Sequence, residues 1–176
     1  MVLCKKKRSK INSKKNLRNE IFSKIQQFTN FLTFQFGHPN ICTHINYAFA
    51  FVTDDGRGLR IFEANDFTLY AQIMALKLKN PNLKVILSVG GWTHGTGGFA
   101  LAAASESSRT TFAYNALTFI KTHQFDGIDI DWEYPGFAGG PKPGKSSDKH
   151  NYVPFLQKLK DVFHASSPPL LGLDFE

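Results

Sequence analysis

The sequence predicts an α/β fold in which short buried strands alternate with amphipathic helices. Two observations lead to this prediction: brief apolar runs rich in β-branched and aromatic residues, and longer stretches between them in which apolar residues recur at helical spacing. Strands that alternate with helices pair in parallel, because each helix returns the chain to the same edge of the sheet. About four such repeats fit either a doubly wound sheet or roughly half of a closed barrel of eight repeats.

Four runs have the composition of strands. The first, residues 28–36, is rich in aromatic and β-branched residues and is followed by a glycine and a proline. Residues 45–52 and 84–89 are largely apolar, which is typical of strands covered on both faces. The fourth run, residues 125–132, alternates apolar residues with acids, so it has one apolar and one acidic face. These runs supply the strands of the predicted sheet.

Three other stretches have the pattern of helices. Apolar residues recur at helical spacing over residues 66–79, with Asp66 as a candidate N-cap and Pro81 beyond the end. A second helix begins at a cap formed by Ser107, and a third spans residues 149–164 with its apolar side chains on one face. The helices therefore follow the strands in the order that parallel pairing requires.

Nearly all of the net charge of +7 lies at the amino terminus. Residues 1–24 contain nine Lys or Arg against one acid, Glu20. Basic blocks bind nucleic acid or anionic lipid in some proteins, but this composition is more typical of a solvated, disordered tail. We therefore divide the chain into a disordered tail, residues 1–24, and one domain, residues 25–176, and expect no nucleic-acid partner.

The sequence shows no targeting, membrane or metal signal. Residues 10–18 are polar where a secretion signal needs an apolar stretch, so no signal peptide is visible. No apolar run approaches the length of a membrane span. Cys4 and Cys42 lie far apart and form no metal-binding pattern with the scattered histidines. We therefore expect no membrane span, no metal and no cofactor.

The acids of the last predicted strand are its most informative feature, because burying carboxylates is costly. Side chains two positions apart point to the same face of a strand, so Asp129, Asp131 and Glu133 share one face while the apolar residues between them pack on the other. Glu133 comes last, at the carboxyl end of the strand, where the active sites of barrels and open α/β sheets form. This row is the candidate catalytic site.

Repulsion within the row favours retention of a proton. Neighbouring acids on one face are about 6.6 Å apart and repel by roughly 2.5 kcal/mol at an effective dielectric constant near 20. This energy corresponds to nearly two pKa units, so the row should hold a proton near neutral pH, as a general acid must. A solvated acidic loop or a metal site is the alternative, but a loop would not alternate so regularly and no histidine lies nearby.

Two motifs resemble signatures of glycoside hydrolase family 18. The pattern DxxDxDxE is matched by Asp126, Asp129, Asp131 and Glu133, and the pattern SxGG by residues 88–91, which Trp92 follows. Residues 42–50 also resemble the second strand of this family. The resemblance covers about residues 41–163 and implies that residues 25–176 form the N-terminal half of a TIM barrel, a partial (β/α)8 fold.

The resemblance implies an endochitinase-like glycoside hydrolase. Its substrates and partners would be chitin or chito-oligosaccharides, which are β-1,4-linked polymers of N-acetylglucosamine. It would degrade these polysaccharides outside the cell. Acids on one strand cannot flank a glycosidic bond as the carboxyls of ordinary glycosidases do, so the nucleophile must come from elsewhere, such as the substrate. In this family Glu133 would act as general acid/base, Asp131 would orient the substrate's 2-acetamido group as nucleophile, and Asp129 would share the proton network, with retention of configuration.

The remaining site residues follow from the same resemblance. Ser88 would support the acids by hydrogen bonding, and Gly90 and Asp126 would support the site structurally. The residues expected to contact sugar are Phe49, Gly91, Trp92 and Tyr134. For Trp92, a place in the core is nearly as plausible as a sugar contact. Both glycines also suit the turn that leaves the strand.

The chain departs from the family at both ends. Residues 26–31 lack the cysteine and the tryptophan of the family's first strand, so Cys42 lacks its family disulfide partner. The later strands, with their substrate-contacting residues, are absent, so we expect the chain as given to be incomplete and inactive. Two other functions stay open: a non-catalytic carbohydrate-binding relative, and a basic-tail module that retains part of a barrel.

Overall fold

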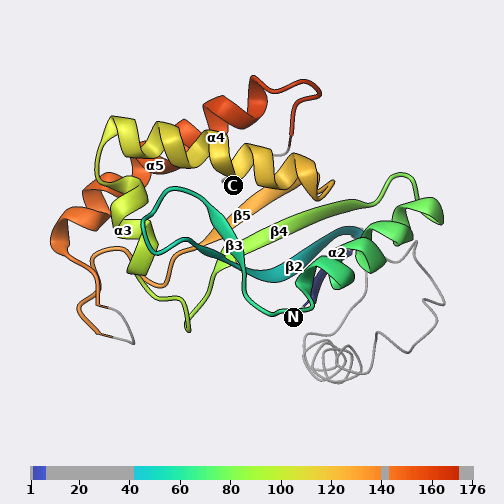
Figure 1. Cartoon of the computed structure of the whole chain (residues 1–176), viewed down its shortest axis with the longest axis horizontal. Coiled ribbons are helices and arrows are strands. Elements are labelled where there is room, and N and C mark those ends of the chain that lie inside the picture. The colour runs from blue at the N-terminus through green and yellow to red at the C-terminus, as the bar shows by residue number, and fades with distance from the viewer. Residues whose placement is uncertain (1, 7–41, 140–142, 171–176) are drawn as a thin grey trace, which may run out of the picture.

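The computed structural model describes residues 2–6, 42–139 and 143–170 (Figure 1). Its centre is a five-stranded sheet in the order β1-β2-β4-β5, with β3 beside β2. Strands β2 (Cys42–Val52), β4 (Lys84–Gly90) and β5 (Gly127–Asp131) are parallel neighbours. The short strands β1 (Val2–Lys6) and β3 (Leu59–Ile61) both pair antiparallel with β2. The parallel centre confirms the α/β prediction.

The amino-terminal strand β1 was not expected from the sequence. It lies within the segment that composition assigned to a disordered tail, yet its backbone pairs with β2. Composition cannot reveal such a partner, because a ladder is made by backbone groups that every residue except proline carries. The rest of that tail, residues 7–24, and the strand predicted at residues 28–36 lie outside the described residues.

Cys42 is disulfide-bonded, although the sequence offered no family partner for it. The chain contains only two cysteines, and strand pairing places the backbone of Cys4 opposite Ile45 in β2. The separation of the two cysteines along the chain shows no spacing motif, so sequence reasoning missed the bond.

The helices lie where the sequence placed them, with one addition. A helix over residues 66–79 was predicted, and the structure has α2 (Asp66–Met74) followed by the 3₁₀ turn η2 (Ala75–Leu78). The two later predictions correspond to α4 (Glu106–Thr122) and α5 (Ser146–His164). The short helix α3 (Gly97–Ala103) was missed, because it opens with two glycines, which are poor helix formers. Among the described residues, no helix is both long and apolar enough to cross a membrane.

Both predicted N-caps were wrong. Ser105, not Ser107, caps α4: its hydroxyl accepts from the amide of Ser108 at 3.1 Å, and the Ser108 hydroxyl accepts from the amide of Ser105 at 2.9 Å. In α2 the N-cap position is Asn65, whose side chain makes no capping bond, and Asp66 is the first helical residue.

Asp66 instead ties three segments together. It is almost fully buried, and its carboxylate accepts hydrogen bonds from the amides of Phe62 at 2.9 Å and Glu63 at 2.8 Å and from the hydroxyl of Tyr47. The segment that follows β3, the start of α2 and the strand β2 are thereby joined at one buried carboxylate.

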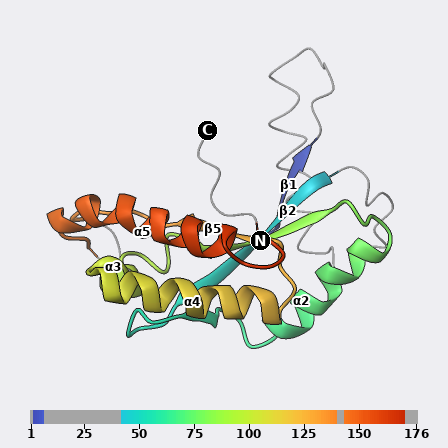
Figure 2. The same ribbon diagram turned by 90° about the horizontal axis from the view of Figure 1, so that it is seen from above.

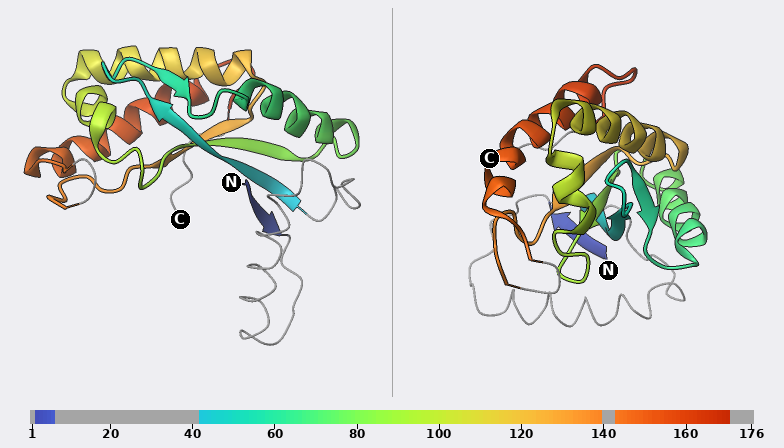
Figure 3. Two further views of the ribbon diagram at one scale, coloured as in Figure 1. Left: turned by 60° about the horizontal axis from the view of Figure 1, so that its bottom comes forward. Right: turned by 60° about the vertical axis from the view of Figure 1, so that its left-hand side comes forward.

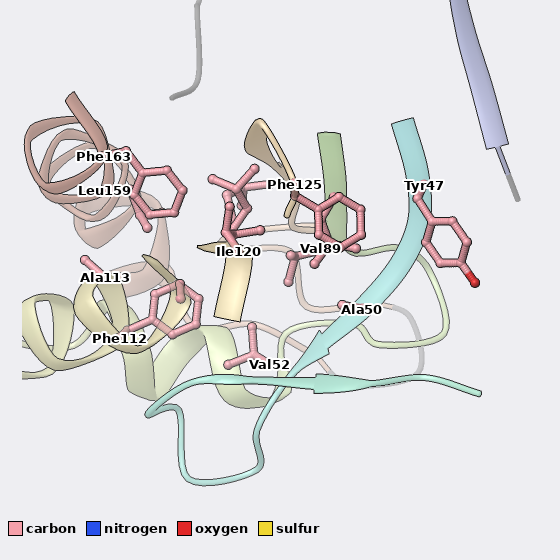
Figure 4. Close-up of a cluster of buried hydrophobic side chains, with 14 of the residues drawn as sticks. Tyr47, Ala50, Val52, Val89, Phe112, Ala113, Ile120, Phe125, Leu159 and Phe163 are labelled. Atoms are coloured by element: carbon pink, nitrogen blue, oxygen red, sulfur yellow. The ribbon is translucent and has the colours of Figure 1, made fainter. Parts of the chain in front are cut away.

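The hydrophobic core lies between the sheet and the helices. Helices α4 and α5 lie side by side, and the left view of Figure 3 shows them above the strands (Figures 2 and 3). Phe112 from α4, Phe163 from α5 and Val89 from β4 belong to one cluster of buried side chains in this layer (Figure 4). The opposite face of β5 carries the acids, so the helices leave the candidate site free.

Candidate active site

The alternation predicted for the last strand is confirmed. Ile128, Ile130 and Trp132 are buried in the core beneath the helices. The three acids between and after them are only partly buried, which places them on the other face of β5. One face of this strand therefore anchors it to the helices while the other presents Asp129 and Asp131, and Glu133 follows two residues after the end of β5.

Asp129 is held by two neighbouring strands. Ser88 in β4 lies opposite it in the parallel register, and the buried Ser88 hydroxyl donates to Asp129 Oδ2 at 2.7 Å. Asn46 in β2 donates its side-chain amide to the same oxygen at 3.3 Å. Ser88 thus makes the hydrogen bond expected of it. Asn46 was missed, although a polar side chain within a nearly apolar strand was a usable signal.

Asp131 lies between the other two acids of the row. Burial, followed by the charges of Glu133 and then Asp129, raises the pKa of Asp131 above its ordinary value. This is the direction that repulsion along one strand face predicts. Asp131 therefore retains its proton to higher pH than an isolated aspartate does.

Two glycines shape the chain where it leaves β4. Gly90 has a φ of +117°, and a Cβ at this position would lie 2.2 Å from the carbonyl oxygen of Asp131. The amide of Gly91 donates to that same oxygen at 2.9 Å. A Cβ at Gly91 would lie 3.0 Å from the ring of Phe49, so this ring packs directly on the turn. The ends of β4 and β5 are thus joined by backbone contacts that no larger residue permits.

Two aromatic residues follow these strand ends and face solvent. The side chain of Trp92 is 54% exposed and that of Tyr134 is 50% exposed. Both rings are therefore open to solvent in the part of the chain that the structure describes. Both rings come directly after the strand segments that bear Gly91 and Glu133, so apolar surface is available beside the acid row.

Asp126 lies apart from the other acids, at the start of β5. Its carboxylate accepts from the amide of Val85 at 2.8 Å and forms ion pairs with Lys77 and Lys84, the latter at 3.5 Å. These contacts bind the beginning of β5 to β4 and to the end of η2. They fit the structural role expected of Asp126.

A further support, which sequence reasoning missed, lies beneath Glu133. The indole nitrogen of Trp132 donates to the hydroxyl of Thr96 at 3.2 Å, and both side chains are buried. The ring of Phe99 in α3 stacks on Trp132 with a centroid separation of 5.2 Å and an interplanar angle of 11°. These contacts hold the residue that precedes Glu133 in one orientation.

Among the described residues, no group of His, Cys, Asp and Glu side chains has an arrangement that could hold a metal ion. The acid row has hydrogen-bond donors on its Asp129 side and exposed aromatic rings at its open end. Such an arrangement can transfer a proton to a bound ligand and offers the ligand an apolar surface.

Comparison with known proteins agrees with this geometry. A sequence profile described as Glycosyl hydrolases family 18 matches residues 13–171. Chitotriosidase-1 of Mus musculus is 45% identical over 125 residues, which cover 71% of this chain and 26% of the mouse protein. The structure of the chitinase TsES1 from Trichuris suis matches with a TM-score of 0.64 and 39% identity, over 76% of this chain and 34% of that one.

A third relative binds sugar without being named as an active enzyme. Human YKL-39, described as a pseudo-chitinase with retained chitooligosaccharide binding, matches with a TM-score of 0.60 and 30% identity, over 72% of this chain and 32% of its own. The chain therefore spans about a quarter to a third of the length of these relatives. The matches confirm part of a TIM barrel rather than a doubly wound sheet, and the chain belongs to glycosyl hydrolases family 18.

Proposed function

We propose that this chain carries the acid-bearing part of an endochitinase-like enzyme, which cleaves β-1,4-linked N-acetylglucosamine polymers by a retaining, substrate-assisted mechanism. The observation that carries the proposal is the row of acids on one face of β5, with its proton favoured at Asp131 and with Glu133 at the open end. Membership of the family and the similarity to chitotriosidase-1 supply the substrate class.

Glu133 is the general acid of the first step. In its protonated form it gives its proton to the glycosidic oxygen while the bond to the anomeric carbon breaks. The acetamido oxygen of the same sugar attacks that carbon and closes a cyclic intermediate. Water then opens the ring and loses a proton to the Glu133 carboxylate, so the configuration is retained after two displacements.

Asp131 orients the acetamido group and stabilises the charge that develops on it. Its raised pKa supports this role, because a proton that Asp131 retains can move as the charge on the sugar changes. Ser88 and Asn46 hold Asp129 in place behind it. The acids come from one strand and the residue that follows it, which supports a second reactive group supplied by the substrate itself.

Sugar binding without hydrolysis is the second candidate function. The similarity to YKL-39 and the exposed rings of Trp92 and Tyr134 suit binding alone. The presence of Glu133 at the end of the row favours hydrolysis, because a binding protein has no need of a proton donor there. A basic-tail module, the third possibility, predicts binding that weakens steeply with salt and disappears when residues 1–24 are removed.

The chain alone is expected to be a poor catalyst. It spans about a third of each matched structure. By the family resemblance, further groups that contact the acetamido group come from strands beyond these residues. Each lost hydrogen-bond donor of this kind costs about 2.7 to 4 kcal/mol in the transition state. Two such losses slow the reaction roughly ten-thousandfold, so these residues by themselves should show almost no turnover.

We also propose that the whole protein acts outside the cell, because chitin is an extracellular polymer. The disulfide at Cys42 supports this location, because disulfides persist mainly in oxidising compartments. The proposal predicts that the protein is recovered with Cys42 oxidised from the medium of the cells that produce it.

The hydrolytic proposal is tested in a chain completed to eight repeats. Glu133→Gln should abolish release of fluorophore from a chitobiose or chitotriose substrate while binding of the oligosaccharide persists. Fully deacetylated chitosan should resist cleavage by the parent enzyme, because it lacks the nucleophile. Substantial turnover by the Glu133→Gln variant would reject the acid, and cleavage of chitosan as fast as chitin oligomers would reject the substrate-assisted route.

A further inference from the structure

The loop after β5 carries a second exposed aromatic residue, Phe137, which neither the family motifs nor the fold requires. Its side chain is 49% exposed, almost as much as that of Tyr134. The two rings meet edge to face, with a centroid separation of 6.0 Å and an interplanar angle of 83°. The two rings together form a compact apolar surface of the kind on which a sugar ring can pack.

The backbone around Phe137 holds its ring in place. Its amide donates to the carbonyl of Tyr134 at 3.2 Å, and its carbonyl accepts from the amide of Gly144 at 2.7 Å. A Cβ at Gly139 would lie 2.6 Å from ring atoms of Phe137, so the ring rests directly on the Gly139 backbone. An exposed side chain fixed in this way loses little conformational freedom when a ligand binds.

The pair is tied to the acid row by sequence. Tyr134 is the residue after Glu133, and Phe137 belongs to the turn that Tyr134 begins. We expect a sugar polymer bound at Glu133 to extend past this turn or past Trp92, because both segments directly follow the ends of neighbouring strands. The apolar faces of its pyranose rings match aromatic surfaces in chemistry.

We propose that Phe137 is a specificity-determining residue that contacts an N-acetylglucosamine unit further along the polymer than the unit at Glu133. The inference rests on the proposed function and deepens it, because a contact with Phe137 makes the binding affinity depend on the length of the chito-oligosaccharide. A short ligand that fills only the positions beside Glu133 does not reach Phe137, whereas a longer one does.

The proposal predicts a length-dependent loss. Phe137→Ala should weaken binding of chitohexaose roughly three- to tenfold, the range that one aromatic contact supplies, and leave chitobiose binding unchanged. Phe137→Trp, which keeps an aromatic face, should restore the affinity for the hexamer. Tyr114→Ala is the matched control, because Tyr114 is a 58% exposed aromatic residue on α4, and it should alter neither affinity.

Isothermal titration calorimetry of the chain completed to eight repeats, and of the same variants in that chain, with chitobiose and chitohexaose measures the effect. Near-ultraviolet circular dichroism first shows that each protein is folded. A hexamer-specific loss in Phe137→Ala supports the proposal. Equal weakening of both ligands, or of neither, overturns it while the proposed function stands. A folded parent protein that binds neither ligand overturns the proposed function itself, together with this inference.

Discussion

Replacing Gly90 by alanine should destabilise the protein more than any conservative change at its surface. The residue has a φ of +117°, and the new Cβ would lie 2.2 Å from the carbonyl oxygen of Asp131. Backbone strain of this kind costs about 1 to 3 kcal/mol. Relief of the overlap also displaces the oxygen that accepts from Gly91, and loss of that hydrogen bond costs about 1 kcal/mol more. We expect a total of about 3 kcal/mol.

Urea denaturation followed by tryptophan fluorescence measures this cost. With a slope of about 2 kcal/mol per molar urea, the midpoint should fall by about 1.5 M. Gly58→Ala is the matched control, because its Cβ would meet its nearest neighbour, the Cβ of Asn115, at an ordinary 3.5 Å. A Gly90→Ala midpoint within about 0.3 M of the parent would show that the ends of β4 and β5 are not locked in the way described.

Two further substitutions test the electrostatics and the helix start. Because burial and neighbouring acids raise the pKa of Asp131, its contribution to stability is present below the ordinary carboxyl pKa and is lost as pH rises through the raised value. Asp131→Asn should therefore be more stable than the parent protein at pH 7 and equally stable at low pH. Denaturation curves recorded at a series of pH values measure this difference. A variant less stable than the parent at pH 7 would contradict the reasoning. Ser105→Ala should lower the free energy of unfolding by about 1 kcal/mol, because the capping box is lost. Ser107→Ala should leave this free energy nearly unchanged. Denaturation of both variants at one pH measures the difference between them.

The acid row could be predicted from the sequence because the period of a strand is local. Once residues 125–132 were taken as a strand, the faces of Asp129 and Ile130 followed from the spacing alone. The partners of Asp129 could not be found in this way. The contact with Asn46 depends on the register of strands that are far apart in the chain, and no local pattern sets that register.

The errors at the helix starts have a different cause. Ser105 and Ser107 are chemically identical candidates, and the structure selects Ser105 because the hydroxyl of Ser108 can return its hydrogen bond. Asp66 is a good capping residue by type, but three donors from neighbouring segments occupy its carboxylate. Groups that are distant in the sequence compete for this side chain only in the folded protein. The capping preferences of single residue types therefore cannot predict the outcome.

The hydrogen bond from the amide of Gly91 to the carbonyl of Asp131 has a consequence for how the site can vary. The loops that bear Trp92 and Tyr134 both leave the sheet at this hydrogen bond. The positions at which the two loops begin are therefore fixed by backbone atoms rather than by side chains. Loops that begin at backbone positions fixed in this way can differ in length and sequence while the spacing between their first aromatic residues stays constant. A scaffold of this kind is suited to loop exchange, because new binding surfaces can be grafted there without disturbing the acids below.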